Sequence, residues 1–200
     1  MRYQLPWVLF LSLLFISCAG GGPPKPKSVY APPAELSAEN LVEFRLLPPE
    51  KKLLLQSALG LVTEYGWLKY QFGSADPLQG GMDCSGAMFH LLREFDYEVP
   101  RTSAQQYLWL EKESGIQKDL EKVQPGDLVF WSGTYVPTDG RKINITHVGL
   151  YLGREVKDGK QVMVCSSKGR SYRGRKRNGY SVFDFKPGAR FAGFASLPVR

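Results

Sequence analysis

Cysteine and histidine are scarce in this sequence: three cysteines and two histidines occur among 200 residues. Three unevenly spaced cysteines cannot form the disulfide framework of a small secreted scaffold. Two histidines cannot build a histidine-rich metal centre, so we expect neither a metal ion nor another cofactor. Charged residues make up 22% of the chain against 43% hydrophobic residues, which excludes a protein that is disordered throughout.

Long hydrophobic runs are also missing. The apolar run over residues 7–16 is too short to span a hydrocarbon layer about 30 Å thick, but it follows Arg2 and suits the hydrophobic region of a signal peptide. Residues 15–19 (FISCA) resemble a bacterial lipobox, in which Cys18 becomes the first mature residue and carries lipid. We therefore predict a signal peptide over residues 1–17 and a membrane anchor at Cys18, with palmitate among its acyl chains. An ordinary signal peptide with an incidental Cys18 is the alternative.

The segment after Cys18 is rich in Gly, Pro and Lys, which disfavours a helix. We interpret residues 18–33 as a flexible tether and place one folded domain over residues 34–200. Because Ala19 and not Asp follows Cys18, the resemblance favours the periplasmic face of the outer membrane in a cell that has one.

Positive charge is concentrated at the C-terminal end, where residues 141–200 contain 14 basic and 3 acidic residues. Residues 168–177 hold six basic side chains and no acidic one. Few aromatic residues accompany them, so we expect no nucleic-acid partner. We predict a loop beyond a strand that ends near Ser167. Its charges either lie beside a cleft and attract carboxylates or are simply solvated.

Residues 82–86 (MDCSG) precede an apolar pattern with helical spacing. Asp83 is well placed to cap this helix, which puts Cys84 in the first turn. The unpaired N–H groups and the helix dipole favour a thiolate there, so we expect a depressed Cys84 pKa. The alternative is an inert thiol in the core.

Residues 145–153 (ITHVGLYLG) alternate as a strand does. Val148, Leu150 and Leu152 share one face, and His147 lies on the other. A histidine there can accept a thiol proton if the fold brings it within about 3 Å of the sulfur. A purely structural histidine is the alternative, and we assign no role to His90.

Four segments in this order resemble the NlpC family of papain-like cell-wall cysteine peptidases: 83–86 (DCSG), 100–106 (PRTSAQQ), 125–130 (PGDLVF) and 147–153 (HVGLYLG). Residues 70–73 (YQFG) resemble the tyrosine-containing turn that precedes the nucleophile in that family. The resemblance implies an α+β fold in which the helix that carries the nucleophile packs on an antiparallel sheet.

The resemblance also implies roles for individual residues. Cys84 would be the nucleophile and His147 the base. Positions that line the substrate cleft in the family correspond here to Tyr70, Asp83 and Ser85, with Asp83 facing an amine of the stem peptide. Arg101 and Ser103 either support this cleft or order a turn.

The family has a third polar residue on the next strand, where it orients the imidazole. The matching residues are 162–167 (VMVCSS), and aligning the serine pair puts Val164 in that position. A hairpin turn near residues 156–157 would place His147 opposite Ser166, whose hydroxyl could bond the ring instead. We expect Cys165 to be a buried, unpaired thiol.

The combined interpretation is a lipid-anchored peptidase that hydrolyses amide bonds of peptidoglycan stem peptides, between D-γ-glutamyl and a diamino acid. The missing third polar residue motivates the alternative of a weakly active or inactive lipoprotein that only binds muropeptides.

Overall fold

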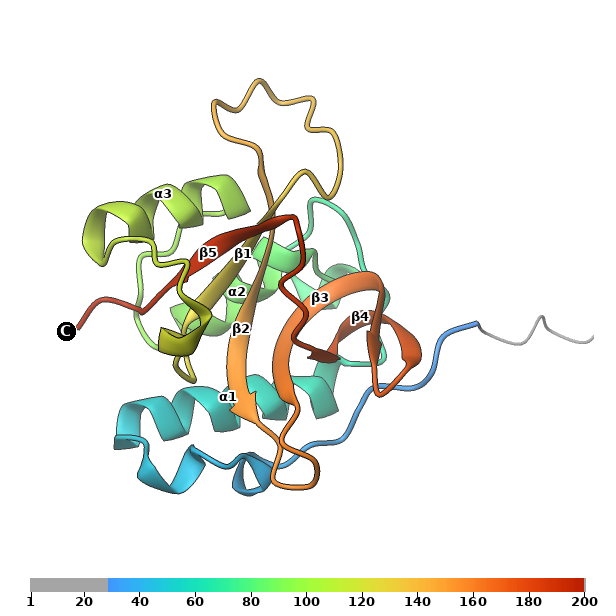
Figure 1. The fold of residues 1–200 in the computed structure, drawn as a ribbon. Helices are drawn as coiled ribbons and strands as arrows, with labels where there is room; N and C mark the ends of the chain where they lie inside the picture. The colour runs from blue at the N-terminus through green and yellow to red at the C-terminus, as the bar shows by residue number, and fades with distance from the viewer. Residues whose placement is uncertain (1–28, 200) are drawn as a thin grey trace, which may run out of the picture.

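Three α-helices precede a five-stranded antiparallel sheet within residues 29–199, which are the residues that the computed structural model describes (Figure 1). The strands lie in the order β4-β3-β2-β1-β5. The elements are α1 (Pro49–Tyr65), α2 (Cys84–Arg93), α3 (Ser103–Glu113), β1 (Leu128–Ser132), β2 (Ile145–Arg154), β3 (Gln161–Tyr172), β4 (Arg175–Asp184) and β5 (Phe191–Ala195). Single 3-10 turns occur at Ala38–Asn40, Phe44–Leu46, Pro77–Gln79 and Leu120–Lys122. The expected signal peptide and Cys18 lie outside the described residues.

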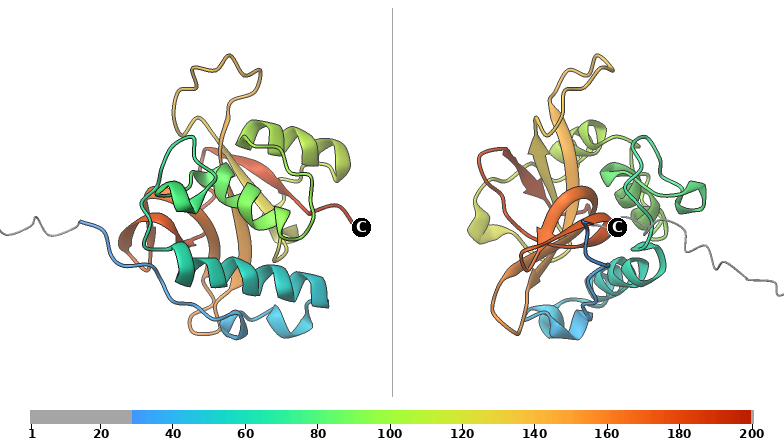
Figure 2. Two further views of the ribbon diagram at one scale, coloured as in Figure 1. Left: turned by 180° about the vertical axis from the view of Figure 1, so that it is seen from behind. Right: turned by 90° about the vertical axis from the view of Figure 1, so that its right-hand side faces the viewer.

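The helices cover one face of the sheet, as the right-hand view of Figure 2 shows. Helix α1 begins with Pro49 at its first position, where the missing N–H is not needed. Its buried side packs near β4, and the Tyr180 hydroxyl donates a 3.0 Å hydrogen bond to the Ala58 carbonyl. The expected α+β fold, with helices packed on an antiparallel sheet, is confirmed (Figure 2).

Helix α2 starts where the sequence predicts. The Asp83 side chain accepts a 2.6 Å hydrogen bond from the Gly86 N–H, so it caps the helix. A Cβ at Gly86 would lie 2.1 Å from the Ser74 carbonyl oxygen, so only glycine lets the 73–75 loop pass this close. This approach holds the loop against the helix turn that carries Cys84.

Both faces of the sheet are buried. Val148, Leu150 and Leu152 face the helices and belong to the main core. The opposite face carries a second cluster built around Trp131, Tyr151, Met163, Cys165, Phe183 and Phe194. The predicted split of β2 between an apolar face and a face bearing His147 is confirmed, because His147 contacts Trp131 and Cys165.

The β3–β4 hairpin curls back onto its own base. The Arg173 N–H at its tip donates to the Asp184 carboxylate at the end of β4, at 3.0 Å. The Tyr172 hydroxyl donates to the buried Glu155, which also pairs with the Arg173 guanidinium. The segment before the first 3-10 turn is bound to the same hairpin, since the Ala31 N–H donates to the Lys176 carbonyl at 2.8 Å.

Candidate active site

A cavity of about 210 Å³ opens at the first turn of α2. Its walls come from the loop before α2, the start of α2, the turn before α3, the β1–β2 connection and the start of β2. The lining residues are Tyr70, Phe72, Gly73, Asp83, Cys84, Ser85, Arg101, Thr102, Ser103, Tyr135, Asp139, Arg141 and Thr146. Six of the eight residues singled out in the sequence are therefore brought together here, whereas His147 and Ser166 do not line the cavity.

Cys84 is almost fully buried, with 5% of its surface exposed. Its sulfur lies 3.9 Å from the Thr146 carbonyl oxygen, so it sits beside the backbone that carries His147. Backbone N–H groups of Val148, Ser85 and Cys84 lower its pKa, but burial and the Asp83 charge raise it more, to about 11. The predicted depressed pKa is wrong, because the helix start is buried as well as electropositive.

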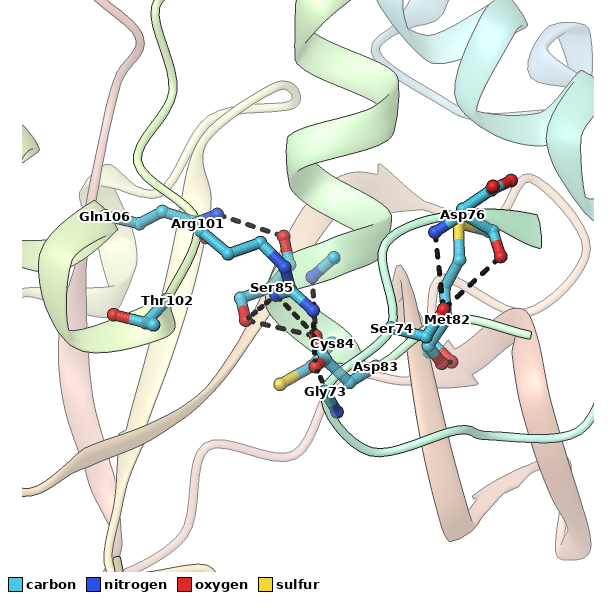
Figure 3. Close-up of polar contacts among 12 residues, drawn as sticks. Gly73, Ser74, Asp76, Met82, Asp83, Cys84, Ser85, Arg101, Thr102 and Gln106 are labelled. Carbon is cyan, nitrogen blue, oxygen red and sulfur yellow. Dashed lines mark hydrogen bonds and ion pairs between the residues drawn. The ribbon is translucent and has the colours of Figure 1, made fainter. Parts of the chain in front are cut away.

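Asp83, Ser85 and Arg101 form one polar cluster beside Cys84 (Figure 3). The Arg101 guanidinium donates to both Asp83 carboxylate oxygens, at 3.1 and 2.8 Å, and to the Ser85 hydroxyl at 3.1 Å. Asp83 also accepts from the Ser85 hydroxyl and from the backbone N–H groups of Gly73 and Gly86. Both oxygens of Asp83 are therefore occupied by internal partners, which fix the loop, the helix start and the 101 turn to one another.

Ser103 and Gln106 attach α3 to the site. The Ser103 hydroxyl donates to the Ile145 carbonyl at 3.1 Å, which ties the start of α3 to β2. The Gln106 amide donates to the carbonyls of Ser85 and Pro100 at 3.0 and 2.9 Å. These bonds hold the wall of the cavity rather than aim polar groups at its centre.

His147 is buried on the opposite face of the sheet from the helices. Its Nε2 lies 3.6 Å from the Cys165 sulfur, and its ring is tilted against Trp131 at a centroid distance of 5.5 Å. Burial lowers the His147 pKa to about 3, with a further contribution from the positive charge of Arg170. The Arg170 guanidinium is stacked over Trp131 at 4.2 Å.

The expectation that Ser166 orients His147 is wrong. Leu150 pairs with Val164 and Tyr151 with Met163, and this register is one residue away from the one that sets His147 opposite Ser166. Because side chains alternate between faces, one residue reverses which of them meets the ring. Ser166 faces the helix side instead and donates a 2.5 Å hydrogen bond to the Met82 carbonyl, just before helix α2.

Two features make the β2–β3 register differ from the predicted one. The hairpin closes with the Glu155 N–H donating to the Lys160 carbonyl at 2.8 Å, a wider turn than the one predicted at residues 156–157. The pairing also shifts between Tyr151 and Gly153. Continuing the pairing past Leu150 sets Gly149 beside Cys165, and a Cβ at Gly149 would lie 3.2 Å from the Cys165 Cβ.

The sulfur of Cys84 and the ring of His147 share no hydrogen bond within residues 29–199; each has a different partner, Thr146 and Cys165. With a thiol pKa near 11 and an imidazole pKa near 3, both groups are neutral at pH 7. The two residues are therefore not a preformed thiolate–imidazolium pair.

The β1–β2 connection supplies residues that the sequence reasoning missed. This loop stands away from the sheet at the top of Figure 1 and brings Tyr135, Asp139 and Arg141 to the cavity. Arg141 donates to both carboxylate oxygens of Asp139 and to the Ile145 carbonyl. Tyr135 meets the Phe72 ring edge-on at 5.4 Å. Glycine and proline marked the segment as a loop, but nothing in their pattern showed that it reaches Cys84.

The basic run over residues 168–177 is not a free loop. Strand β3 continues to Tyr172, beyond the end predicted near Ser167. Arg170 is stacked over Trp131, which contacts His147. Arg173 instead pairs with Glu155 at the base of the hairpin, and Arg177 is 7% exposed and lies against the Tyr172 ring. One arginine of the basic run therefore lies beside the residues that surround His147, and two others stabilise the curled β3–β4 hairpin.

Cys165 is a free, buried thiol, as predicted. Burial raises its pKa to about 12, with Arg170 acting in the opposite direction and Cys84 in the same one. Within the described residues, no group of three or more His, Cys, Asp or Glu side chains could hold a metal ion. None of the helices in that part of the chain is long and apolar enough to cross a membrane.

The family model described as NlpC/P60 matches residues 66–181, which contain helix α2, strand β2 and most of the β3–β4 hairpin. The chain belongs to the NlpC/P60 family. Its α+β fold, in which helix α2 packs on an antiparallel sheet, is the papain-like fold expected from the motifs.

Two similar proteins are a hydrolase and a solved structure. A gamma-DL-glutamyl hydrolase from Bacillus subtilis (strain 168) is 32% identical over 91 residues, which are 45% of this chain and 19% of that protein. A lipoprotein-like NLP/P60-family protein from Staphylococcus aureus has a similar structure, with a TM-score of 0.51 and 21% identity, over 84% of this chain and 44% of that one. This chain thus spans less than half the length of either.

Proposed function

We propose that this NlpC/P60 domain hydrolyses amide bonds in the peptide stems of peptidoglycan, with Cys84 as nucleophile and His147 as general base. One observation carries the proposal: the Cys84 sulfur lies in the wall of the cavity and against the backbone of Thr146, the neighbour of His147. Family membership and the similarity to a gamma-DL-glutamyl hydrolase support the reaction class.

The reaction would begin when the thiol of Cys84 attacks the amide carbon while His147 takes the thiol proton. The backbone N–H groups of Cys84 and Ser85, in the first turn of α2, would stabilise the oxyanion. Collapse of the tetrahedral intermediate breaks the C–N bond, and the imidazolium returns the proton to the leaving amine. Water activated by His147 then hydrolyses the thioester and regenerates the thiol.

The substrate we propose is the bond between D-γ-glutamyl and a diamino acid. The named activity of the 32%-identical relative supports a γ-linked glutamyl group. Tyr70 lines the cavity beside Cys84 and is the polar group proposed to contact the stem. Ser85 and Ser103, whose hydroxyls are bonded within the domain, form the cavity walls together with the Asp83–Arg101 pair.

The test is turnover of purified muropeptides by the mature domain, followed by mass spectrometry. Cys84→Ala and His147→Ala should each abolish the cleaved products, whereas His90→Ala, at the other histidine, should retain them. If the wild-type protein binds muropeptides measurably but leaves them intact, the proposed hydrolase would be rejected in favour of a muropeptide-binding protein. The raised Cys84 pKa favours this second candidate.

We also propose that Cys18 carries the lipid that holds the domain at the cell envelope, on the periplasmic face of an outer membrane where one exists. The lipobox-like residues 15–19 support this. Cys18→Ser should move the protein from the membrane to the soluble fraction. Wild-type protein with an unmodified N-terminus in the soluble fraction would refute the anchor.

A further inference from the structure

The imidazole of His147 has two nitrogens, and the proposed reaction uses one of them. The structure gives the other a partner: Nε2 lies 3.6 Å from the sulfur of Cys165, within the range for a hydrogen bond to sulfur. Both residues are buried, and the ring is held by Trp131 on the neighbouring strand. This contact fixes which nitrogen remains for the substrate side.

A histidine can accept a proton from Cys84 only through an unprotonated nitrogen. Because Nε2 is turned toward Cys165, Nδ1 is the nitrogen left for that task. A neutral imidazole with a free Nδ1 carries its hydrogen on Nε2, and that hydrogen needs an acceptor in a buried site. The base-competent tautomer therefore requires an acceptor at the position that Cys165 occupies.

We infer that Cys165 is the positioning residue of His147: its sulfur accepts the Nε2–H and holds the imidazole in the tautomer whose Nδ1 is free. This inference rests on the proposed function, since it assigns a partner to the proposed base. It also corrects the expectation that Val164 takes this position, because Val164 lies in the core on the helix side of β3.

The neighbouring groups do not offer a better acceptor. Ser166 lies on the other face of β3, where its hydroxyl donates to the Met82 carbonyl. Arg170, stacked over Trp131, carries only donors. The charged or titratable groups that act on this pair are Arg170 and Cys84, and the Cys165 thiol stays neutral because burial raises its pKa to about 12. The neutral sulfur of Cys165 is the hydrogen-bond partner that the structure gives Nε2.

A thiol sulfur accepts hydrogen bonds only weakly, so the tautomer preference it imposes is modest. Removing the acceptor should lower kcat by about three- to tenfold, the range expected for one net hydrogen bond, and leave KM unchanged. Cys165→Ala removes the acceptor, and Cys165→Ser keeps one at nearly the same volume. This matched pair separates the hydrogen bond from the packing.

The experiment combines steady-state kinetics on muropeptides with two-bond 1H–15N correlation spectra of 15N-histidine protein. The chain has two histidines, so His90 serves as the internal reference. We expect the Nε2–H tautomer of His147 in the wild type and in Cys165→Ser. In Cys165→Ala we expect a larger share of the Nδ1–H tautomer together with the fall in kcat.

A wild-type protein with His147 mainly as Nδ1–H would overturn the inference, and this measurement needs no variant that could fail to fold. The same tautomer and the same kcat in the Ala and Ser variants would also overturn it. A wild-type protein without turnover would refute the proposed hydrolysis instead, and the spectra would still decide the role of Cys165.

Discussion

Replacing Arg101 with Met should destabilise the domain, because it removes the charged partner of Asp83. The Asp83 side chain is 9% exposed and that of Arg101 32%, so the pair is shielded from water on one side only. Breaking a fully buried pair costs about 3–5 kcal/mol. Here Asp83 keeps three donors, from Gly73, Ser85 and Gly86, so we expect about 2–3 kcal/mol.

Urea unfolding followed by fluorescence would measure this change as a shift of midpoint at constant m-value. Arg45→Met is the matched control, since Arg45 is exposed and should cost less than about 0.5 kcal/mol. Asp83→Asn keeps the cap acceptor while it removes the charge. The double variant should therefore be less destabilised than the sum of the two single changes. Equal costs for Arg101→Met and Arg45→Met would refute the reasoning.

Three further outcomes follow from the site. Iodoacetamide should modify Cys84 slowly at pH 7–8 and quickly only toward pH 11, because its pKa is raised to about 11; a midpoint near the ordinary value of about 8.5 would contradict this. Arg170→Gln should raise the His147 pKa from about 3, as read by an NMR titration. The folded-state pKa of His147 lies below the unfolded value of about 6.5, so the free energy of unfolding is highest above pH 6.5, where the ring is neutral in both states. Stability should fall as the pH drops from 6.5 toward 3, and it should fall less in Arg170→Gln. Gly86→Ala should lower stability by more than about 2 kcal/mol in thermal melts, because its Cβ meets the Ser74 carbonyl. Gly60→Ala, in open space on α1, should instead stabilise by about 0.5–1 kcal/mol; similar effects at the two glycines would contradict the packing argument.

The sequence by itself determined where helix α2 begins. Asp83 as a cap, followed by an apolar helical pattern, is local information, because a cap and its first turn are only a few residues apart. The alternation of β2 likewise fixed that His147 and Leu150 lie on opposite faces.

The tertiary structure alone decided which side chain meets His147. A wider hairpin turn and one register shift place the β2–β3 pairing one residue away from the predicted register. Because side chains alternate between the two faces of a strand, a shift of one residue changes which β3 side chains lie on the face of His147. Thus Cys165, and not Ser166, contacts the ring. The tertiary structure also decided the direction of the Cys84 pKa shift, because that direction depends on how deeply the start of α2 is buried against β2.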